Sequence, residues 1–372
     1  MRVAVVVIPT YNEASNIKQL IEQIFEVGQK LSKWKIKVLV VDSSSPDNTA
    51  NIVKQLKKTN KDIHLLLTKR EGLGKAYVKG FKYSLNNLEP YVLFEMDADL
   101  SHDPKKIPEF LKKIEEGADF VLGTRYSKGG SIPKNWAFHR KLFSVLGNII
   151  IKLGFAKPNI SDWTTGYRAL KSWVVIKFVD KAEKYSGYVF QVATLDESLK
   201  NNARVQEVPI DFTDRLEGVS KINSIQFIIQ TLLYVLFNSS FIKYALVGAS
   251  SAVIDFGLSF IFIEILKSAI WLGTLISVEA AIIYNFLLNN FWSFSHKKIE
   301  AKKQSYATSF FKFNLIQSFS LFIQISGIQI LANIFGEKYW YLYKFFILAL
   351  IIIPLTYFMY NKFIWKSKIK KQ

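Results

Sequence analysis

The hydrophobic and polar positions divide this chain into two halves of different character. In the first half, short apolar runs alternate with amphipathic stretches of helical length, and each run stops at a polar loop. The runs that read as buried strands cover residues 3–8, 37–41, 63–67 and the segment that starts at Tyr91. Strands that alternate with helices predict an α/β fold with a parallel sheet, whose polar loops share one crevice. In the second half the apolar runs are long enough to cross a membrane.

The run that starts at Tyr91 ends in Asp97 and Asp99, two carboxylates separated by one small residue. Ligands of open α/β sheets bind at the carboxyl ends of the strands. Paired carboxylates at such a place need a positive partner. Oxygen ligands without Cys or clustered His favour Mg²⁺ or Mn²⁺, usually shared with a substrate pyrophosphate. A lone Asp-x-Asp is more often a solvated loop, so this hypothesis depends on what the other strands carry.

The other strands also end in polar loops. Residues 9–13 stop the first strand, Asp42 ends the second at the same kind of position as Asp97, and residues 72–76 open a helix after the third. Glycines at a helix start allow the backbone to approach a ligand closely. Loops that converge on one edge of a sheet predict a binding site there.

From Phe241 onward the sequence predicts four membrane spans, each long enough for a bilayer of about 30 Å. They cover roughly residues 241–266, 269–294, 311–335 and 340–364. Lysines gather in the loop at 295–304 and in the tail, whereas the other two turns carry only Lys267 and Lys338. By the positive-inside rule, we expect an integral membrane protein whose first half and both termini are cytoplasmic.

Two amphipathic stretches precede the spans. Residues 134–155 interleave aromatic and aliphatic side chains with lysine and arginine, and residues 220–238 repeat the pattern up to the first span. Helices in a protein core share this pattern, but an interfacial helix fits a segment that leads directly into a membrane. The expected organisation is an α/β domain at 1–219 that includes the first stretch, an interfacial helix at 220–238, and a four-helix membrane domain at 239–372.

Composition narrows the possible partners only a little. The 372 residues are 50% hydrophobic and carry a formal net charge of +19, which suits nucleic acid, anionic lipid or phosphorylated substrates equally. The absence of cysteine excludes disulfides, thiolate metal sites and cysteine nucleophiles. The first apolar run does not have the basic region, length and cleavage site of a signal peptide. The chemistry must therefore be sought in the motifs.

Seven motifs, in order over roughly 220 residues, resemble those of the dolichol-phosphate mannosyltransferase-like glycosyltransferases of family two. They are the segments 9–13, 42–49, 72–76, 97–102, 123–126, 162–169 and 214–221. Each motif alone is weak, but seven in order are specific. The resemblance implies a GT-A fold, a nucleotide-sugar donor and a polyprenyl-phosphate acceptor.

The resemblance also implies roles for residues of this chain. Those that match the nucleotide-binding positions are Pro9, Tyr11, Glu13, Val41, Asp42, Asp97, Ala98, Asp99, Arg215 and Lys221. Asp97, Asp99 and Ser101 match the metal site, which implies Mg²⁺ or Mn²⁺ as the cofactor. The residues expected to carry catalysis are Asp97, Asp99, Arg125 and Arg215.

The acceptor phosphate needs cations more than it needs a base. A phosphomonoester is already ionised near pH 7, because its second pKa is about 6. Guanidinium groups bind phosphate bidentately, and Arg125 and Arg140 are the candidates, the second on the family-like spacing Trp136-x-x-x-Arg140. A metal and the cations at the donor phosphates would neutralise the leaving pyrophosphate.

The chain departs from the family pattern in three places. Ser101 stands where relatives usually have Gln beside the metal, Ser43 follows Asp42 where many have a second Asp, and Ala193 replaces a usual Glu. These differences leave the sugar preference open. The sequence has no Gln-x-x-Arg-Trp motif of the processive synthases, which favours transfer of a single sugar.

The predicted spans resemble a GtrA-type domain, notably at residues 243–248 and 255–257. Together the resemblances imply inverting transfer of one hexose, in the first place mannose from GDP-mannose to dolichyl or another polyprenyl phosphate. A UDP-glucose-dependent polyprenyl-phosphate glucosyltransferase, and a lipid-linked sugar flippase with a non-catalytic first domain, stay open as alternatives. The expected partners are the nucleotide sugar, the lipid acceptor and the bilayer, without nucleic acid, and a homo-oligomer stays open.

Overall fold

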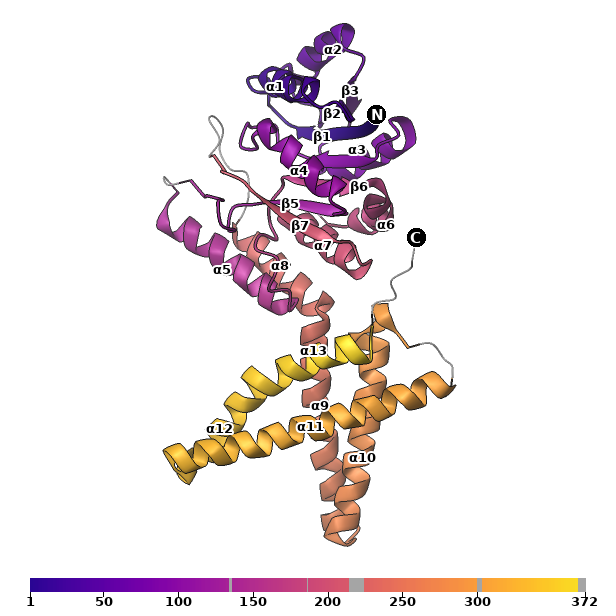
Figure 1. Cartoon of the computed structure of the whole chain (residues 1–372), viewed down its shortest axis with the longest axis vertical. Helices are drawn as coiled ribbons and strands as arrows, with labels where there is room; N and C mark the ends of the chain where they lie inside the picture. The colour runs from indigo at the N-terminus through magenta and orange to yellow at the C-terminus, as the bar shows by residue number, and fades with distance from the viewer. Residues whose placement is uncertain (134–135, 186, 214–223, 300–302, 367–372) are drawn as a thin grey trace. The chain divides into compact units, whose positions relative to one another are not determined.

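The computed structural model describes residues 1–133, 136–185, 187–213, 224–299 and 303–366. The chain forms two compact units, Met1–Val235 and Leu236–Gln372 (Figure 1). The first unit is α/β, and the described part of the second is helical. Each unit has a hydrophobic core of its own.

The first unit is built around a seven-stranded sheet in the order β3-β2-β1-β4-β6-β5-β7. The strands are β1 Arg2–Thr10, β2 Trp34–Asp42, β3 Ile63–Leu67, β4 Val92–Glu95, β5 Phe120–Thr124, β6 Arg168–Lys171 and β7 Val205–Pro209. This architecture confirms the expected α/β fold class. The four strands expected from the sequence, β1 to β4, are parallel to one another as predicted, whereas β6, which was not among them, runs antiparallel to both β4 and β5. An apolar run shows that a strand is buried, but its direction depends on the side from which the chain returns to the sheet.

Helices lie on both faces of this sheet. The helices of this unit are α1 Ile17–Gln29, α2 Thr49–Thr59, α3 Leu73–Asn87, α4 Ile107–Glu115, α5 Phe138–Gly154, α6 Ser172–Ala182, α7 Gly187–Lys200 and α8 Ser224–Asn238. Alternate residues of β1 face the two layers. Val6 belongs to the core that holds Ile21 of α1 and Phe110 of α4. On the other face, a Cβ at Gly80 of α3 would come within 2.6 Å of Val7, so this close helix–sheet packing requires glycine.

The strand register brings the expected loops to one edge of the sheet. Thr10 at the end of β1 pairs with Asp42 at the end of β2, and β4 runs parallel to β1 on its other side. Just beyond these strands the backbone takes left-handed conformations at Asn12 (φ 62°), Ser44 (φ 56°) and Leu100 (φ 63°). Such conformations are costly for residues other than glycine and concentrate at binding sites. The three loops therefore turn at a common edge, with stored backbone strain.

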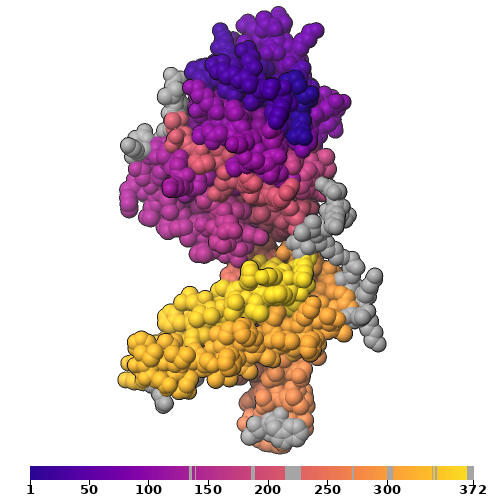
Figure 2. All heavy atoms as spheres, in the orientation of Figure 1, coloured from indigo at the N-terminus to yellow at the C-terminus, as the bar shows by residue number. Residues whose placement is uncertain are grey.

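Two helices of this unit expose apolar side chains. On α5 they include Phe138, Leu142, Phe143, Leu146, Ile149, Ile150 and Leu153, and on α8 they include Ile229, Leu232 and Leu233. Figure 2 shows the α5 region, in magenta, at the surface of the first unit. These helices correspond to the two expected amphipathic stretches, although residues 134–135 and 220–223 lie outside the described chain.

The described part of the second unit contains four helical segments long and apolar enough to cross a membrane, as expected. They are Ser240–Ile265, Leu272–Ser293, Ser305–Phe335 and Leu342–Phe363. The helices that form them are α9 Ser240–Phe260, α10 Ile270–Leu288, α11 Lys303–Phe335, α12 Trp340–Ile347 and α13 Ile353–Phe363, with π-helical turns η2 Ile261–Ile265, η3 Asn289–Ser293 and η6 Leu348–Ile352. The rings of Phe313 and Tyr360 stack at 4.8 Å, and the Trp365 indole N–H donates to Asn290 Oδ1 at 3.0 Å. An aromatic and amide cluster therefore joins the spans.

Candidate active site

The loops that follow β1 and β2 are joined by side-chain hydrogen bonds. Asp42 is fully buried and accepts from Thr10 Oγ1 at 2.9 Å. It also accepts from Ser45, through the backbone N–H at 3.0 Å and through Oγ at 2.6 Å. In the same loop Asp47 accepts from the backbone N–H of Ala14 at 2.9 Å. Both loops are held in one arrangement at the edge where Asp42 was expected to bind a nucleoside.

The other residues expected at the nucleoside lie beside Asp42. Pro9 and Val41 are paired in β1 and β2, and Tyr11 and Glu13 follow in the first loop. The guanidinium of Arg70 lies over the Tyr11 ring, 3.9 Å from its centroid. Aromatic and guanidinium planes are surfaces on which nucleobases stack. Arg70 was not predicted from the sequence, although its position just before the glycine-rich helix start was a signal for it.

Asp97 and Asp99 follow β4 at the same edge of the sheet. Asp99 is buried, and its Oδ1 accepts from Ser101 Oγ at 2.6 Å and from the Ser101 backbone N–H at 3.1 Å. The Asp97 side chain is 30% exposed, and its Oδ1 lies 3.5 Å from the Tyr77 hydroxyl. The Asp99 carboxylate is therefore held by Ser101 inside the protein, while the Asp97 carboxylate is partly exposed to solvent.

His102 holds the other side of Asp97. Its Nδ1 accepts a 3.1 Å hydrogen bond from the Asp97 backbone N–H, so in the neutral ring the proton is on Nε2. That nitrogen lies 4.0 Å from Asp97 Oδ2. The ring stacks on Tyr167 at 4.9 Å and is buried. His102 thus presents an N–H toward the carboxylate that was expected to bind metal.

The two carboxylates fit a hard divalent cation that shares its ligands with a substrate. Among the described residues, no group of three or more His, Cys, Asp or Glu side chains could hold a metal by itself. Mg²⁺ characteristically uses one or two carboxylates and completes its shell with phosphate oxygens and water. In this arrangement the Ser101 hydroxyl orients Asp99, and its direct ligation of metal stays a prediction. A Cβ at Gly166 would lie 3.5 Å from Asp97 Oδ2, so this glycine leaves space above the carboxylate.

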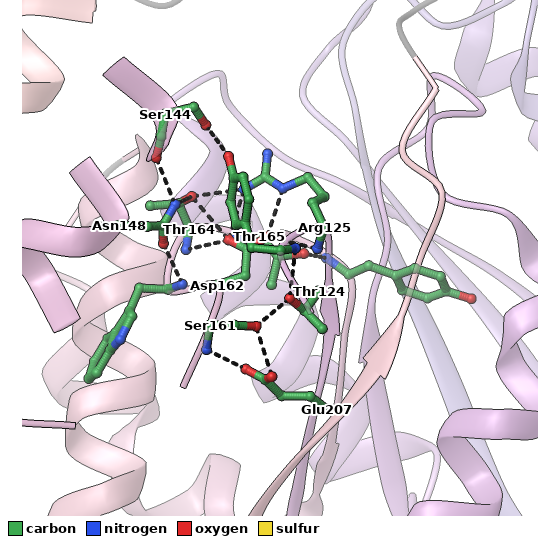
Figure 3. Close-up of polar contacts among 12 residues, drawn as sticks. Thr124, Arg125, Ser144, Asn148, Ser161, Asp162, Thr164, Thr165 and Glu207 are labelled. Carbon is green, nitrogen blue, oxygen red and sulfur yellow. Dashed lines mark hydrogen bonds and ion pairs between the residues drawn. The ribbon is translucent and has the colours of Figure 1, made fainter. Parts of the chain in front are cut away.

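The guanidinium of Arg125 is bound to the buried carboxylate of Asp162 (Figure 3). Nε donates to Oδ2 at 2.7 Å and Nη2 donates to Oδ1 at 2.8 Å, which is the bidentate form of this pair. Nη2 also donates to Thr164 Oγ1 at 2.9 Å. Burial acts to raise the pKa of Asp162, but the charge and hydrogen bonds of Arg125 outweigh it and lower that pKa. The Arg125 charge is balanced inside the protein, and its role at the acceptor phosphate stays a prediction.

Phe212 brings the expected acceptor residues together with the metal side of the site. Its ring centroid lies 5.5 Å from the Arg125 guanidinium carbon, 6.0 Å from the His102 ring and 5.9 Å from the Trp136 ring. The Arg140 guanidinium in turn lies over Trp136 at 4.0 Å, which gives the Trp-x-x-x-Arg spacing a physical basis. Arg125 is therefore connected to His102 through one aromatic ring, Phe212, and Arg140 through two, Trp136 and Phe212.

A buried pair of ionisable residues precedes the site in the strands β4 and β6, and it was not predicted from the sequence. Glu95 and Arg168 are both fully buried, with Arg168 Nε 4.0 Å from Glu95 Oε2. Burial raises the pKa of Glu95 to about 7, and the charge of Arg168 limits the rise. Arg168 donates to the backbone oxygens of Thr165 and Gln191, as a buried cation requires. Charged residues inside apolar strands were the signal that could have identified both.

Arg215 and Lys221, expected at the donor phosphates, lie outside the described residues. Ala98 is buried between the two aspartates. The structure thus brings Asp42, Asp97, Asp99 and Arg125 to one edge of a sheet, while the roles assigned to them stay predictions.

Two protein families match this chain. Residues 5–181 match Glycosyl transferase family 2, and residues 243–365 match the GtrA/DPMS transmembrane domain. The chain is 36% identical over 220 residues to the polyprenol monophosphomannose synthase of Mycolicibacterium smegmatis, covering 59% of this chain and 80% of that one. It is 30% identical over 297 residues to the dolichol-phosphate mannosyltransferase of Pyrococcus furiosus, covering 78% of this chain and 80% of that one.

Solved structures resemble this chain more distantly. The crystal structure of glucosyl-3-phosphoglycerate synthase from Mycobacterium tuberculosis with Mn²⁺, UDP and glucosyl-3-phosphoglycerate has a TM-score of 0.46 and 16% sequence identity. That comparison covers 63% of this chain and 80% of the other.

Proposed function

Because this chain belongs to the dolichol-phosphate mannosyltransferase-like glycosyltransferases of family two, with a GtrA/DPMS transmembrane domain, we propose that it transfers mannose from GDP-mannose to dolichyl or another polyprenyl phosphate. It is a membrane protein and a glycosyltransferase of the mannosyltransferase type. The proposal includes GDP as the nucleotide of the donor, a cytoplasmic first unit, and roles for individual residues of the site.

The proposal depends on one observation: the paired carboxylates and two arginines lie near the same aromatic ring, that of Phe212. Asp97 lies beside His102, and Phe212 links His102 to Arg125 and, through Trp136, to the stacked Arg140. A nucleotide sugar needs a metal-binding pair for its pyrophosphate, and a phosphate acceptor needs cations. The position of these carboxylates and arginines at one edge of the sheet supports the proposal.

The reaction is a displacement at the anomeric carbon. An oxygen of the acceptor phosphate forms a bond to that carbon while the bond to the donor pyrophosphate breaks, which inverts the configuration. Asp97 and Asp99 would hold a divalent cation, which would neutralise the negative charge that develops on the leaving pyrophosphate. Mg²⁺ and Mn²⁺ both suit these ligands.

The chain's own side chains position the reactants. The Ser101 hydroxyl orients Asp99. His102 orients Asp97, because its Nδ1 accepts from the Asp97 backbone N–H and its Nε2 faces the Asp97 carboxylate. Arg125 and Arg140 hold the acceptor phosphate, which is already an anion near pH 7 because its second pKa is about 6. No protein base has to remove a proton from it. Arg215 and Lys221 are proposed to bind the leaving group, in keeping with their motif.

The acceptor explains why a transferase carries membrane spans. Each CH₂ group drawn from lipid into water costs about 0.8 kcal/mol, so a long prenyl chain stays in the bilayer. The exposed apolar side chains of α5 and α8 support a position of both helices in the membrane interface, with the site at headgroup level. The lysine-rich loop and tail support a cytoplasmic location.

The test uses the full-length protein, purified in detergent and returned to lipid vesicles that contain dolichyl phosphate. GDP-mannose, UDP-glucose and other nucleotide sugars are supplied with Mg²⁺ or Mn²⁺, and the lipid product is identified by mass spectrometry. Mannosyl-phosphodolichol formed from GDP-mannose is the expected result. Glucose transfer alone would correct the donor. Failure with every donor would overturn the catalytic proposal and leave lipid-linked sugar movement as the function to test.

A further inference from the structure

Helix α5 has two faces of different chemistry. Its outward face exposes Phe138, Leu142, Phe143, Leu146, Ile149, Ile150 and Leu153. On the inward face Asn148 is only 5% exposed, and Ile151 three residues later is 1% exposed. Asparagine is a poor helix former, and a buried amide is stable only where its hydrogen bonds are made. The contacts of Asn148 therefore need a specific explanation.

The buried amide of Asn148 is bonded to the loop between α5 and β6 (Figure 3). Its Oδ1 accepts from the backbone N–H of Trp163 at 2.7 Å. Its Nδ2 donates to Thr164 Oγ1 at 3.3 Å and to the backbone oxygen of Ser144 at 3.0 Å. The side chain thus joins the middle of a helix to two consecutive loop residues.

These contacts reach Arg125 from two directions. Thr164 Oγ1 accepts from Asn148 and from Arg125 Nη2, and donates to the carboxylate that Arg125 binds. A hydroxyl has one donor and two acceptor positions, so all of its capacity is used. Tyr126, the next residue after Arg125, has its hydroxyl 2.5 Å from Ser144 Oγ on α5. Helix α5 is thus hydrogen-bonded to Thr164, which binds the Arg125 guanidinium, and to Tyr126, the residue that follows Arg125 in the chain.

From this geometry we propose that Asn148 is a positioning residue that connects the depth of α5 in the membrane interface to the placement of Arg125 at the acceptor phosphate. The inference rests on the proposed function, because it concerns a phosphate carried by a lipid. A long prenyl chain fixes the height of its phosphate at the headgroups, so the arginine that meets it must lie at a matching height. The apolar face of α5 sets the depth of this helix in the membrane interface. Asn148 and Thr164 link the helix to Arg125, so they keep the arginine at the corresponding height. A short, water-soluble prenyl phosphate is not subject to this requirement.

The test compares two acceptors on the full-length protein in vesicles of phosphatidylcholine and phosphatidylglycerol. One is dolichyl phosphate in the bilayer, and the other is citronellyl phosphate in solution. Loss of buried hydrogen bonds typically corresponds to about a tenfold change in an equilibrium, so Asn148→Ala should raise the KM for dolichyl phosphate about tenfold. The KM for citronellyl phosphate should change by less than about twofold, because a dissolved phosphate is not held at a fixed height and can follow a displaced Arg125. The KM for GDP-mannose should change as little, because the donor loops and the metal carboxylates are untouched.

The matched control is Asn87→Ala. Asn87 is an exposed helix residue whose Nδ2 donates to the backbone oxygen of Tyr83, four residues earlier, at 2.9 Å. Asn148 makes the same kind of bond to Ser144, so the control removes an equivalent helix contact away from the site. Both KM values should equal those of the unmodified protein.

A second pair of variants keeps the proposal testable if Asn148→Ala does not fold. Thr164→Val removes the shared hydroxyl and should give the same difference between acceptors, whereas Thr164→Ser keeps the hydroxyl and should restore the unmodified KM. In the double variant the effects should not add, because both changes break one connection. Equal losses on both acceptors, or no change on either, would overturn the positioning role. Absence of transfer by the unmodified protein is a different result, which overturns the proposed function itself.

Discussion

The hydroxyl of Tyr234 on α8 donates a 2.8 Å hydrogen bond to the carboxylate of Asp196 on α7. Asp196 is buried, and Lys200 lies 2.7 Å from the same carboxylate oxygen. Burial raises the pKa of Asp196, although Lys200 and Tyr234 act to lower it. This bond fastens the helix that leads into the spans to the body of the catalytic domain.

Tyr234→Phe should therefore destabilise the first unit. A hydrogen bond to a charged group is worth about 1.5–3 kcal/mol, and a domain of this size loses about 2–4 °C in thermal midpoint per kcal/mol. We expect a decrease of several degrees in the unfolding temperature of the full-length protein. Tyr83→Phe is the control, since its hydroxyl makes no hydrogen bond among the described residues. A similar decrease in both variants would show that the Asp196 contact contributes nothing specific.

Asp99→Asn should lower turnover by orders of magnitude while the protein stays folded. The donor pyrophosphate and the carboxylates repel each other unless a cation lies between them, and a neutral amide is a weaker ligand. Mn²⁺ binding in the presence of GDP, followed by electron paramagnetic resonance, should weaken in parallel. Asp103→Asn is the matched control, because Asp103 is exposed. Within the described residues its carboxylate accepts a single hydrogen bond, a helix-capping bond from the Lys105 backbone N–H at 2.9 Å. Full activity of the unmodified enzyme in EDTA would contradict the metal requirement.

Asp162→Asn should reduce both stability and acceptor binding. Removing one partner of a buried ion pair costs about 3–5 kcal/mol, because the other charge is left uncompensated. The pKa of Asp162 is lowered in the folded protein, so its contribution to stability is present above its unfolded pKa and is lost as the pH falls through the lower folded value. Thermal midpoints measured from neutral to acid pH should therefore converge for the variant and the unmodified protein. Parallel curves would argue against this ion pair as the source of stability.

Glu95→Gln should change the pH dependence of stability in the opposite sense. The folded pKa of Glu95 is about 7, above its ordinary value of 4.5, because burial disfavours the charged form. Its contribution is fully present below the unfolded pKa and is lost as the pH rises through the folded value. Between these values the unmodified protein should lose thermal stability with rising pH, and the variant should lose less. An identical slope in both proteins would show that Glu95 does not titrate in this range.

Deletion of residues 239–372 should separate donor binding from transfer. Asp42, Asp97, Asp99 and Arg125 all precede the cut, so calorimetric affinity for GDP-mannose should stay close to that of the full chain. Transfer to dolichyl phosphate in membranes should fall much further, because only α5 and α8 would then hold the enzyme at the bilayer. Equal losses of both would mean that the spans support the fold of the catalytic domain. Unchanged transfer would mean that the two helices suffice.

The sequence by itself determined the features that depend on local pattern. Periodicity identified β1 to β4 and the four spans, because an apolar run reports burial of its own segment. The abrupt ending of a buried strand in Asp97 and Asp99 located the candidate site, because the ends of parallel strands meet at one edge. The lysines in the loop at 295–304 and in the tail predicted which side of the membrane the first unit and the termini occupy, again from a local pattern. That orientation stays a prediction.

Only the tertiary structure decided which distant residues share their charge and hydrogen bonds. Arg125 and Asp162 are 37 residues apart and form a bidentate pair, and Asn148 on a surface helix is bonded to the loop that completes it. The direction of β6 was likewise not visible in its apolar pattern. Such contacts depend on side-chain direction and on how the chain returns to the sheet, and neither is encoded in the spacing of residue types along one segment.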